Sequence, residues 1–265
     1  MSARGVWIAP DLRGRAYSAA LAGLPLRARE ADLPAGAVAV VGGKDGGRAA
    51  FDALAAGATG LIITASSSLS AAAARLIAAA GSVPVIVDRP LLRPDLVEQA
   101  IAGREGAAAL VATAELRATG ADAEGALRDA IGWSRALAGD SFGVVAAGGT
   151  PARFGALLES VVRRIPLVLT VTKATRPAGS PELHLAVLGE TRSEVRLDPA
   201  AGIARVVTVD ADGERIAAAR REAGERLALR RCLDAVEQGV RTDDLAELAA
   251  DAETTERLTA SVARP

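Results

Sequence analysis

The segment VPVIVDRPLLRPD, residues 83–95, places a charged pair between a hydrophobic run and a proline. Asp88, Arg89 and Pro90 stand where a buried strand of an α/β protein would end. The guanidinium of Arg89 keeps its proton above about pH 12, so it cannot act as a general acid or base. It could instead anchor a carboxylate, a phosphate or a sugar hydroxyl. The alternative interpretation is that Asp88 and Arg89 form an ion pair that closes the strand end.

A second group of polar side chains follows the apolar run GLIIT, which ends at Thr64. The serines Ser66–Ser68 and Ser70 come directly after it. At the carboxyl edge of a parallel sheet such a loop faces the ligand crevice, so Thr64, Ser66 and Ser70 are candidates to contact a ribose or a sugar. A polar loop in which Ser70 caps the next helix explains the same residues.

Other kinds of chemistry have little support. The chain contains one histidine, His184, and one cysteine, Cys232, so it offers neither a disulfide nor a Cys/His zinc site. No catalytic triad can be assembled around His184, which we interpret as structural. The segment GGKDGG at 42–47 lacks the Gly-Lys-Ser/Thr order of a P-loop and predicts a turn. We therefore predict no metal site.

Composition limits the partners. Of the 265 residues only 2% are aromatic, and the formal net charge is −1 with no basic stripe, so nucleic-acid binding is not expected. The apolar stretches are interrupted well before the roughly 18 residues that a membrane span needs, and the N-terminus lacks a signal-peptide core. These features favour a soluble cytoplasmic protein with no membrane contact.

Short apolar runs alternate with segments of helical spacing over the first hundred residues. The expected strands are 4–9, 24–30, 36–43, 59–68 and 83–88, and the expected helices are 15–24, 47–57, 70–81 and 93–103. Strands that are apolar on both faces and alternate with helices are typical of a parallel sheet covered on both sides.

The pattern changes beyond about residue 105. A strand at 108–119 and a helix at 123–139 are followed by strand signals at 166–174, 182–190, 193–198 and 203–210, and by helices at 212–239 and 243–262. Strands joined by short turns predict an antiparallel sheet. We therefore predict an α/β protein in which residues 1–118 form a Rossmann-like domain of the dinucleotide-binding type. Residues 119–265 would form an α+β domain with an open, mainly antiparallel sheet and closing helices.

This order of elements resembles the Gfo/Idh/MocA family of nicotinamide-dependent oxidoreductases over nearly the whole chain. GVWIAPDLRGRAYSAALAGLP is similar to the first strand, dinucleotide loop and helix of that family. TGLIITASSSLSAAAARLIAAAGSVPVIVDRPL is similar to its fourth-strand region, which leads to a Glu-Lys-Pro motif. GADAEGALRDAIGWSRALAGD is similar to its helix with catalytic Asp and His. The chain is shorter than is usual for the family, and its sequence predicts no helix between the second and third strands.

The resemblance implies a Gly-x-Gly-x-x-Gly turn, in which glycine lets the backbone approach the pyrophosphate of NAD or NADP. The three positions fall on Ala9, Asp11 and Gly14, so only the last glycine is kept. Asp11 would set a carboxylate beside the diphosphate, which opposes binding. Arg13 and Arg15 could offset that charge. The expected cofactor is thus NAD or NADP, with doubtful binding.

The resemblance also assigns Arg89 to the lysine of Glu-Lys-Pro, which contacts the substrate hydroxyl. In the helix at 123–139, the family's Asp and His fall on Gly125 and Asp129. Asp129 is the titratable group nearest to the place of the missing histidine, and it could serve as a base if burial raised its pKa. The alternative is an ordinary exposed helix carboxylate. Trp133, one turn further on, is expected in the core.

Three elements of the implied oxidoreductase site are thus altered together: the glycine loop, the lysine and the histidine. The favoured prediction is a homologue with eroded cofactor and catalytic motifs, which acts as a weakly active or non-catalytic binding or partner subunit. The alternative is an active NAD(P)-dependent oxidoreductase on a sugar- or polyol-like small molecule. The resemblance further implies a homo- or hetero-oligomer formed through the open sheet.

Overall fold

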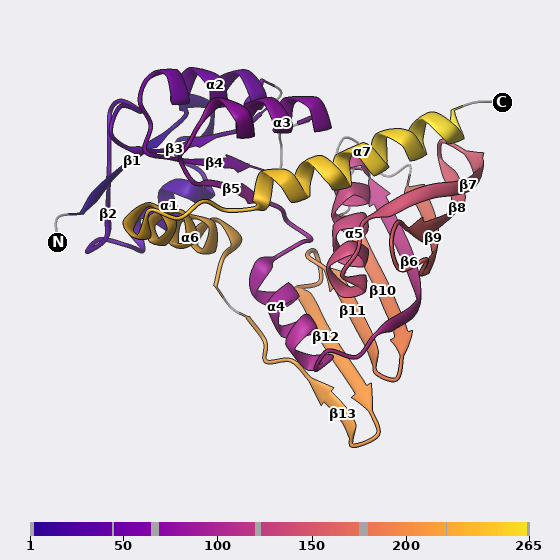
Figure 1. Ribbon diagram of the computed structural model, residues 1–265. Coiled ribbons are helices and arrows are strands. Elements are labelled where there is room, and N and C mark those ends of the chain that lie inside the picture. The colour runs from indigo at the N-terminus through magenta and orange to yellow at the C-terminus, as the bar shows by residue number, and fades with distance from the viewer. Residues whose placement is uncertain are drawn as a thin grey trace. The chain divides into compact units, whose positions relative to one another are not determined.

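The computed structural model describes residues 3–43, 45–64, 69–119, 123–174, 180–220 and 222–263 (Figure 1). Internal contacts divide the chain into two compact units. Unit 1 contains residues 1–89 and 221–249, and unit 2 contains residues 90–220 and 250–265. Among the described residues the strands form one five-stranded and one eight-stranded sheet.

Unit 1 contains the parallel sheet with its helices. Its elements are β1 (Arg4–Ile8), the short 3-10 helix η1 (Pro10–Leu12), α1 (Ala16–Ala22), β2 (Ala28–Glu30), β3 (Val38–Val41), α2 (Gly46–Ala55), β4 (Gly60–Thr64), α3 (Ala71–Ala80), β5 (Val85–Asp88), α6 (Gly224–Gln238) and the start of α7 (Asp244–Val262). The strands pair in the order β2-β1-β3-β4-β5, all parallel. This confirms the predicted Rossmann-like sheet.

Both faces of the parallel sheet are buried, because successive side chains of a strand point to opposite faces. Val38, Val40 and Ile62 pack with α1 and α6, whereas Leu61 and Ile63 pack with α2, α3 and the start of α7. The strands therefore appear in the sequence as continuous apolar runs rather than as alternating ones.

No helix separates β2 from β3. Residues 31–37 form a short connection of bends and turns instead. The chain thus passes from β2, on one side of β1, to β3 on the other side. This agrees with the shortened pattern that the sequence predicts.

Unit 2 contains α4 (Pro94–Gly103), β6 (Ala109–Thr119), α5 (Ala123–Ala138), β7 (Phe142–Thr150), β8 (Arg153–Ser160), β9 (Pro166–Ala174), β10 (Glu182–Gly189), β11 (Arg192–Asp198), β12 (Ile203–Asp210), β13 (Gly213–Ile216) and the end of α7. The strand order is β13-β12-β11-β10-β6-β9-β8-β7, and only the β6–β9 pairing is parallel. The predicted open, mainly antiparallel sheet is thereby confirmed.

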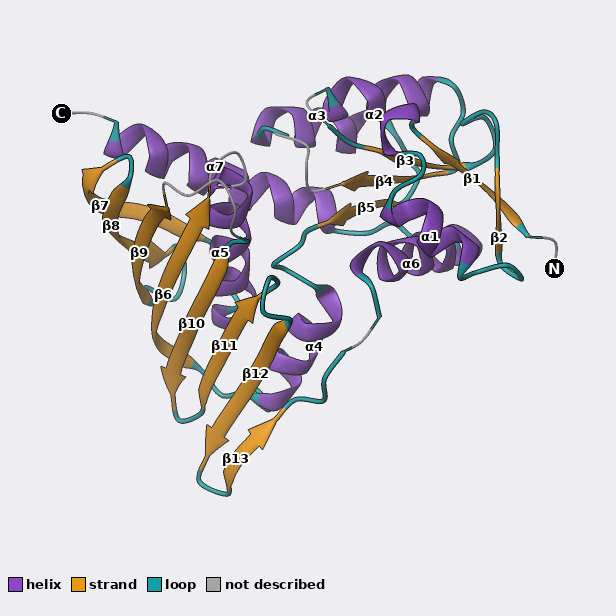
Figure 2. Cartoon of the chain, turned by 180° about the vertical axis from the view of Figure 1, so that it is seen from behind, coloured by secondary structure: helices purple, strands orange, loops and turns teal. Residues whose placement is uncertain are grey.

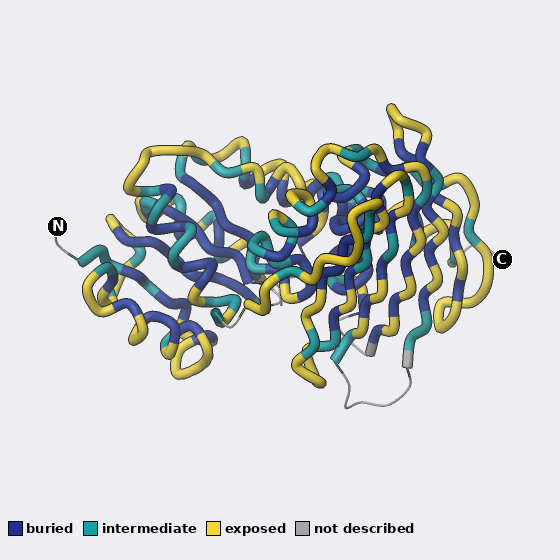
Figure 3. The backbone as a smooth tube through the Cα atoms, turned by 90° about the horizontal axis from the view of Figure 1, so that it is seen from below, coloured by how far each residue is buried: buried dark blue, intermediate teal, exposed yellow. Residues whose placement is uncertain are grey.

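Among the described residues, helices lie on one face of the eight-stranded sheet and not on the other (Figure 2). Burial alternates along its strands, as Figure 3 shows. On the covered face α4 and α5 contribute Leu96, Leu127 and the fully buried Trp133, the expected core residue. Arg104 is also buried, at 4% exposed, and donates hydrogen bonds to the carbonyl oxygens of Ala107 and Thr191. Burial lowers the pKa of its guanidinium.

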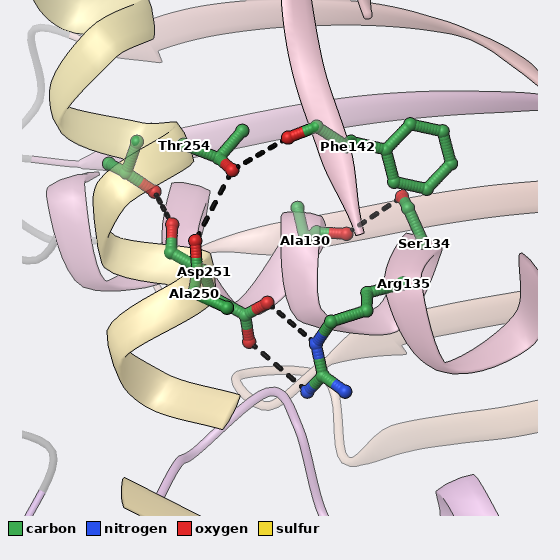
Figure 4. Close-up of polar contacts among 8 residues, drawn as sticks. Ala130, Ser134, Arg135, Phe142, Ala250, Asp251 and Thr254 are labelled. Atoms are coloured by element: carbon green, nitrogen blue, oxygen red, sulfur yellow. Dashed lines mark hydrogen bonds and ion pairs between the residues drawn. The ribbon is translucent and has the colours of Figure 1, made fainter. Parts of the chain in front are cut away.

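Polar contacts within unit 2 join α5 to the end of α7 (Figure 4). Arg135 forms an ion pair with Asp251 at 2.8 Å, and the Asp251 side chain is only 1% exposed. The Thr254 hydroxyl donates to the carbonyl oxygen of Phe142 at the start of β7. A charge buried this deeply requires its partner, so the pair fixes how these two helix segments meet.

The two units differ from the predicted domains 1–118 and 119–265. β6, expected to close the first domain, lies in the middle of the eight-stranded sheet, and α6 with the start of α7 belongs to unit 1. The burial pattern of β6 explains its place, because Ala112, Ala114 and Leu116 are buried while the residues between them are exposed. Such alternation suits a sheet with one open face. The start of the expected helix 212–239 is likewise strand β13.

Candidate functional site

The strand order of unit 1 defines a switch point between β1 and β3. The chain leaves β1 toward β2 on one side, and β3 then pairs with the other side of β1. In open α/β sheets, ligands bind outside the carboxyl ends of the strands at such a point. The residues found there are the loop 9–15 after β1, Gly42 and Gly43 after β3, and Thr64 at the end of β4.

The loop after β1 is held close to β3. Ala9 is 5% exposed, and its amide donates to the carbonyl oxygen of Val40 at 2.9 Å. Leu12 is buried on η1, and Arg13 Nε donates to the carbonyl oxygen of Ile8. Gly14 has a φ of 69°, in the left-handed region that favours glycine. The last glycine of the implied motif therefore has a conformational reason to be kept.

Asp11 lies at the mouth of the switch point. A Cβ built on Gly43 would stand 3.0 Å from Asp11 Oδ2, so this carboxylate lies directly over the end of β3. Arg13 and Arg15 are exposed on the same loop, and Arg15 is the N-cap residue of α1. The loop after β1 thus carries two arginines and one carboxylate.

Thr64 and Gly42 form a tight contact beside this loop. Thr64 is 7% exposed, and a Cβ at Gly42 would come within 2.0 Å of its hydroxyl oxygen. Glycine at 42 is therefore required by the packing of β3 against β4. Ser66 lies outside the described residues, and Ser70 is the N-cap of α3, where its hydroxyl accepts from the amide of Ala73 at 3.2 Å. The capping interpretation of Ser70 is confirmed.

Arg89 follows the edge strand β5, beyond β4 and therefore two strands away from β3. It is 7% exposed and has interactions of its own. Asp88 accepts a 2.6 Å hydrogen bond from the Tyr17 hydroxyl, and Gly224 at the start of α6 lies beside it. Burial, and next the Asp88 charge, raise the pKa of Tyr17 far above its ordinary value, so Tyr17 acts as a fixed donor.

The free edge of β5 is covered by side chains from the α6–α7 connection. The amide of Val87 donates to Asp244 Oδ2 at 3.0 Å, and the Thr242 hydroxyl donates to the carbonyl oxygen of Val85. Arg231 donates two hydrogen bonds to Asp244, at 2.9 and 3.0 Å. These contacts satisfy backbone groups that would otherwise be open to another strand. Sequence analysis missed them, since no local pattern marks Asp244.

Asp129 lies in unit 2, on the buried face of α5, and is 4% exposed. Its Oδ2 accepts from the amide of Leu91 at 3.1 Å, and one turn further on Trp133 Nε1 donates to the carbonyl oxygen of Leu91 at 2.6 Å. Both backbone groups of Leu91 are therefore held by one helix face. The expectation of an exposed carboxylate is wrong; Asp129 is buried and positions the start of unit 2.

No group of three or more His, Cys, Asp or Glu side chains suited to a metal ion occurs in the described part of the chain. Among the same residues, no helix is long and apolar enough to cross a membrane. His184 lies on an exposed position of β10 and not in the core.

No model of a known protein family matches the chain, and no curated protein matches it in sequence. Several solved structures, in contrast, have a similar fold. UDP-N-acetylglucosamine 3-dehydrogenase GnnA from Acidithiobacillus ferrooxidans has a TM-score of 0.78 at 12% identity, covering 98% of this chain and 97% of its own. Levoglucosan dehydrogenase in complex with NADH and L-sorbose has a TM-score of 0.74 at 15% sequence identity, and the match covers 100% of this chain and 98% of that one. GenD2 from gentamicin A biosynthesis in complex with NAD has a TM-score of 0.71 at 18% sequence identity, and the match covers 100% of this chain and 95% of that one.

These neighbours are sugar dehydrogenases of the Gfo/Idh/MocA type. The chain therefore has the two-part α/β fold of that group over nearly its whole length, which confirms the resemblance predicted from the sequence at the level of the fold.

Proposed function

We propose that this protein is an NAD(P)-dependent oxidoreductase that acts on a sugar- or polyol-like small molecule. The observation that carries the proposal is the similarity of both sheets, over 98% to 100% of the chain, to dehydrogenases whose names specify sugar substrates or whose structures hold NAD or NADH. A fold can persist after its activity is lost, so the function also depends on the residues at the site.

The loop after β1 fits a nucleotide by charge but departs from the glycine pattern. Arg13 and Arg15 outnumber Asp11, which leaves a net positive charge at the end of β1. We infer that the Arg15 guanidinium would hold the phosphates, with Thr64 and Ser70 as further candidates, because the amides of Ala9, Leu12 and Gly14 already donate hydrogen bonds within the chain. The nicotinamide of a bound cofactor would supply hydride chemistry, which no amino-acid side chain provides.

Two residues of this chain are proposed for the substrate. Arg89 keeps its charge at all accessible pH values and would orient a hydroxyl or an anionic group. Asp129 would take the hydroxyl proton as general base. Because its carboxylate already accepts from the Leu91 amide, this role requires that oxygen to keep its hydrogen bond while the carboxylate binds a proton.

A second candidate function is a binding or partner subunit with little or no turnover. The specific observation in its favour is the structural use of Asp129, whose hydrogen bond to the Leu91 amide accounts for its burial without catalysis. The Arg89 guanidinium in place of a lysine points the same way, since it cannot exchange a proton.

Thermal unfolding in the presence of NAD(H) and of NADP(H) separates the two candidates. A ligand at about 100 times its Kd stabilises the folded state by roughly 2.7 kcal/mol. A clear shift with one nucleotide, followed by absorbance change at 340 nm with a panel of sugars and polyols, would support the oxidoreductase. The absence of any shift, together with stable co-purification of another chain, would support the subunit.

We also propose that the open face of the eight-stranded sheet mediates oligomer formation. The support is that no helix in the described part of the chain covers this face, and that Leu157 and Val168 are exposed on the sheet.

A further inference from the structure

The helix-covered face of the eight-stranded sheet carries a lysine at the end of β9. Leu167, Leu169 and Val171 alternate along this strand and are at most 1% exposed. Because side chains two residues apart point to the same face, Lys173 continues this buried row. Its own side chain is half-buried, so solvent reaches part of it. Charged side chains usually avoid such a face unless they have a partner.

The neighbours of Lys173 across the sheet are small and uncharged. Ala118 on β6 lies directly opposite and is fully buried. On the other side, the backbone amide of Lys173 donates to the carbonyl oxygen of Ala152 at 2.7 Å. Within the residues that the structure describes, the Lys173 ammonium forms no ion pair or hydrogen bond. No carboxylate of the described chain therefore neutralises its charge.

The position of Lys173 along the strand places this charge near the start of α5. β6 and β9 are parallel, and their carboxyl ends, Thr119 and Ala174, lie opposite each other. The chain continues from β6 into α5, which packs against both strands. The rise from Ala123, the first residue of α5, to Asp129 is about 9 Å along the helix axis. Lys173 thus lies at the end of unit 2 that also carries the proposed base.

An ammonium in this setting favours an anionic ligand over a neutral one. A charge that is partly removed from water is destabilised unless an opposite charge lies beside it. A sugar hydroxyl can accept a hydrogen bond from Lys173, but it leaves the positive charge in place. A carboxylate or phosphate oxygen accepts the hydrogen bond and also neutralises the charge, and hydrogen bonds of this kind are about twice as strong as neutral ones.

We propose that Lys173 binds an anionic group of the substrate, so that the substrate is a sugar or polyol with a carboxylate or a phosphate. The inference rests on the oxidoreductase proposed above and names the class of its substrate. Lys173 takes no part in the transfer of the proton or the hydride. It holds a part of the substrate away from the reacting carbon and thereby determines specificity.

The test compares substrates that are matched in shape and differ in charge. Glucose, glucuronate and glucose 6-phosphate form one set, galactose and galacturonate a second, and sorbitol and gluconate a third. The change in nucleotide absorbance gives kcat/KM for each compound with the wild type. In at least one set the anionic compound should have a kcat/KM about 10- to 100-fold above its neutral counterpart, the range expected for one hydrogen bond between charged groups. The carboxylate and phosphate arms show which anion is bound.

Variants of Lys173 separate its charge from its bulk. Lys173→Met removes the charge and should lower kcat/KM for the anionic compounds alone, so that the preference disappears. Lys173→Arg keeps the charge and should keep the preference. Arg153→Gln is the matched control, because Arg153 is exposed and lies opposite Thr172, on the other face at the same end of the sheet. It changes the net charge by the same amount as Lys173→Met and should behave like the wild type. Circular dichroism checks that each variant is folded.

Three results would overturn this proposal and leave the oxidoreductase in place. They are equal use of neutral and anionic compounds by the wild type, a preference that persists in Lys173→Met, and an equal loss of the preference in Arg153→Gln. A wild type that oxidises none of the compounds would contradict this proposal and the proposed activity together. Thermal unfolding with each nucleotide then shows whether the cofactor itself is bound.

Discussion

The Tyr17 hydroxyl donates a 2.6 Å hydrogen bond to Asp88 Oδ2, and the two residues are 71 positions apart in the sequence. The bond joins the first turn of α1 to the carboxyl end of β5. Tyr17 is 5% exposed and packs in the cluster that α1 and α6 form on the parallel sheet. Burial and the Asp88 charge raise the pKa of the phenol, which favours the protonated form that donates this bond.

Tyr17→Phe removes this donor without changing the shape of the ring. We expect the free energy of unfolding to fall by about 1.5–3 kcal/mol, because a half-buried carboxylate loses a hydrogen bond. Urea unfolding followed by circular dichroism gives the value. Asp88→Asn should lower the free energy of unfolding by a similar amount. The double variant should lose less than the sum of the two single losses. Strictly additive losses would show that the two side chains are not coupled.

Much of the fold could be predicted because local patterns of apolar residues determine its strands and helices. Continuous apolar runs such as VPVIVD identify strands buried on both faces, and the alternation of ELHLAVLG identifies a strand with one open face. The predicted boundary at 118 differs from the unit division because chain order does not reveal pairing. β6 lies between β9 and β10, which come more than forty residues later.

The candidate site was harder to predict for a related reason. The positions of Ala9, Asp11 and Gly14 follow from one short segment, and they lie in the loop after β1 at the switch point. The partners of Asp88 and of Asp129 lie far away in sequence or are backbone amides. Neither leaves a local signal, so the burial of Asp129 could be found only in the folded chain.

Asp244→Asn tests the protection of the β5 edge. The substitution keeps the size of the side chain but removes the charge that Arg231 binds with two hydrogen bonds. We expect a loss of about 1.5–3 kcal/mol in the free energy of unfolding, and faster aggregation because the strand edge opens more readily. Light scattering at elevated temperature measures the aggregation.

Asp234→Asn is the control for that experiment. Asp234 also pairs with an arginine, Arg27, at 2.8 Å, but its side chain is 38% exposed. Ion pairs of this kind contribute about 0–1 kcal/mol. Equal losses in the two variants would contradict a special role for the β5 edge.

Cys232 makes the stability of the protein depend on pH in the alkaline range. Burial raises the pKa of its thiol to about 12, whereas an unfolded cysteine titrates near 8.5. The folded state thus binds the thiol proton more tightly than the unfolded state does. The resulting contribution to the free energy of unfolding is fully present below pH ~8.5 and is lost as the pH rises toward 12. Between pH 8.5 and 10 the wild type should lose about 2 kcal/mol more than Cys232→Ala, measured by urea unfolding. If the free energy of unfolding changed equally with pH in the two proteins, the thiol of Cys232 would not be the source of the pH dependence.

Asp11 decides how well the loop after β1 can hold a nucleotide. Its carboxylate lies over Gly43 at the end of β3, where it would repel a diphosphate, while Arg15 on the same loop would attract one. Asp11→Asn should therefore bind NAD(H) or NADP(H) about 3- to 10-fold more tightly, and Arg15→Gln more weakly by a similar factor, with both effects shrinking as salt is added. Titration calorimetry gives each Kd. Asp52→Asn, an exposed change of equal charge on α2, should leave the Kd unaltered. If Asp11→Asn bound no more tightly than the wild type, the carboxylate would not face the phosphates, and the nucleotide would have to lie elsewhere than at the switch point.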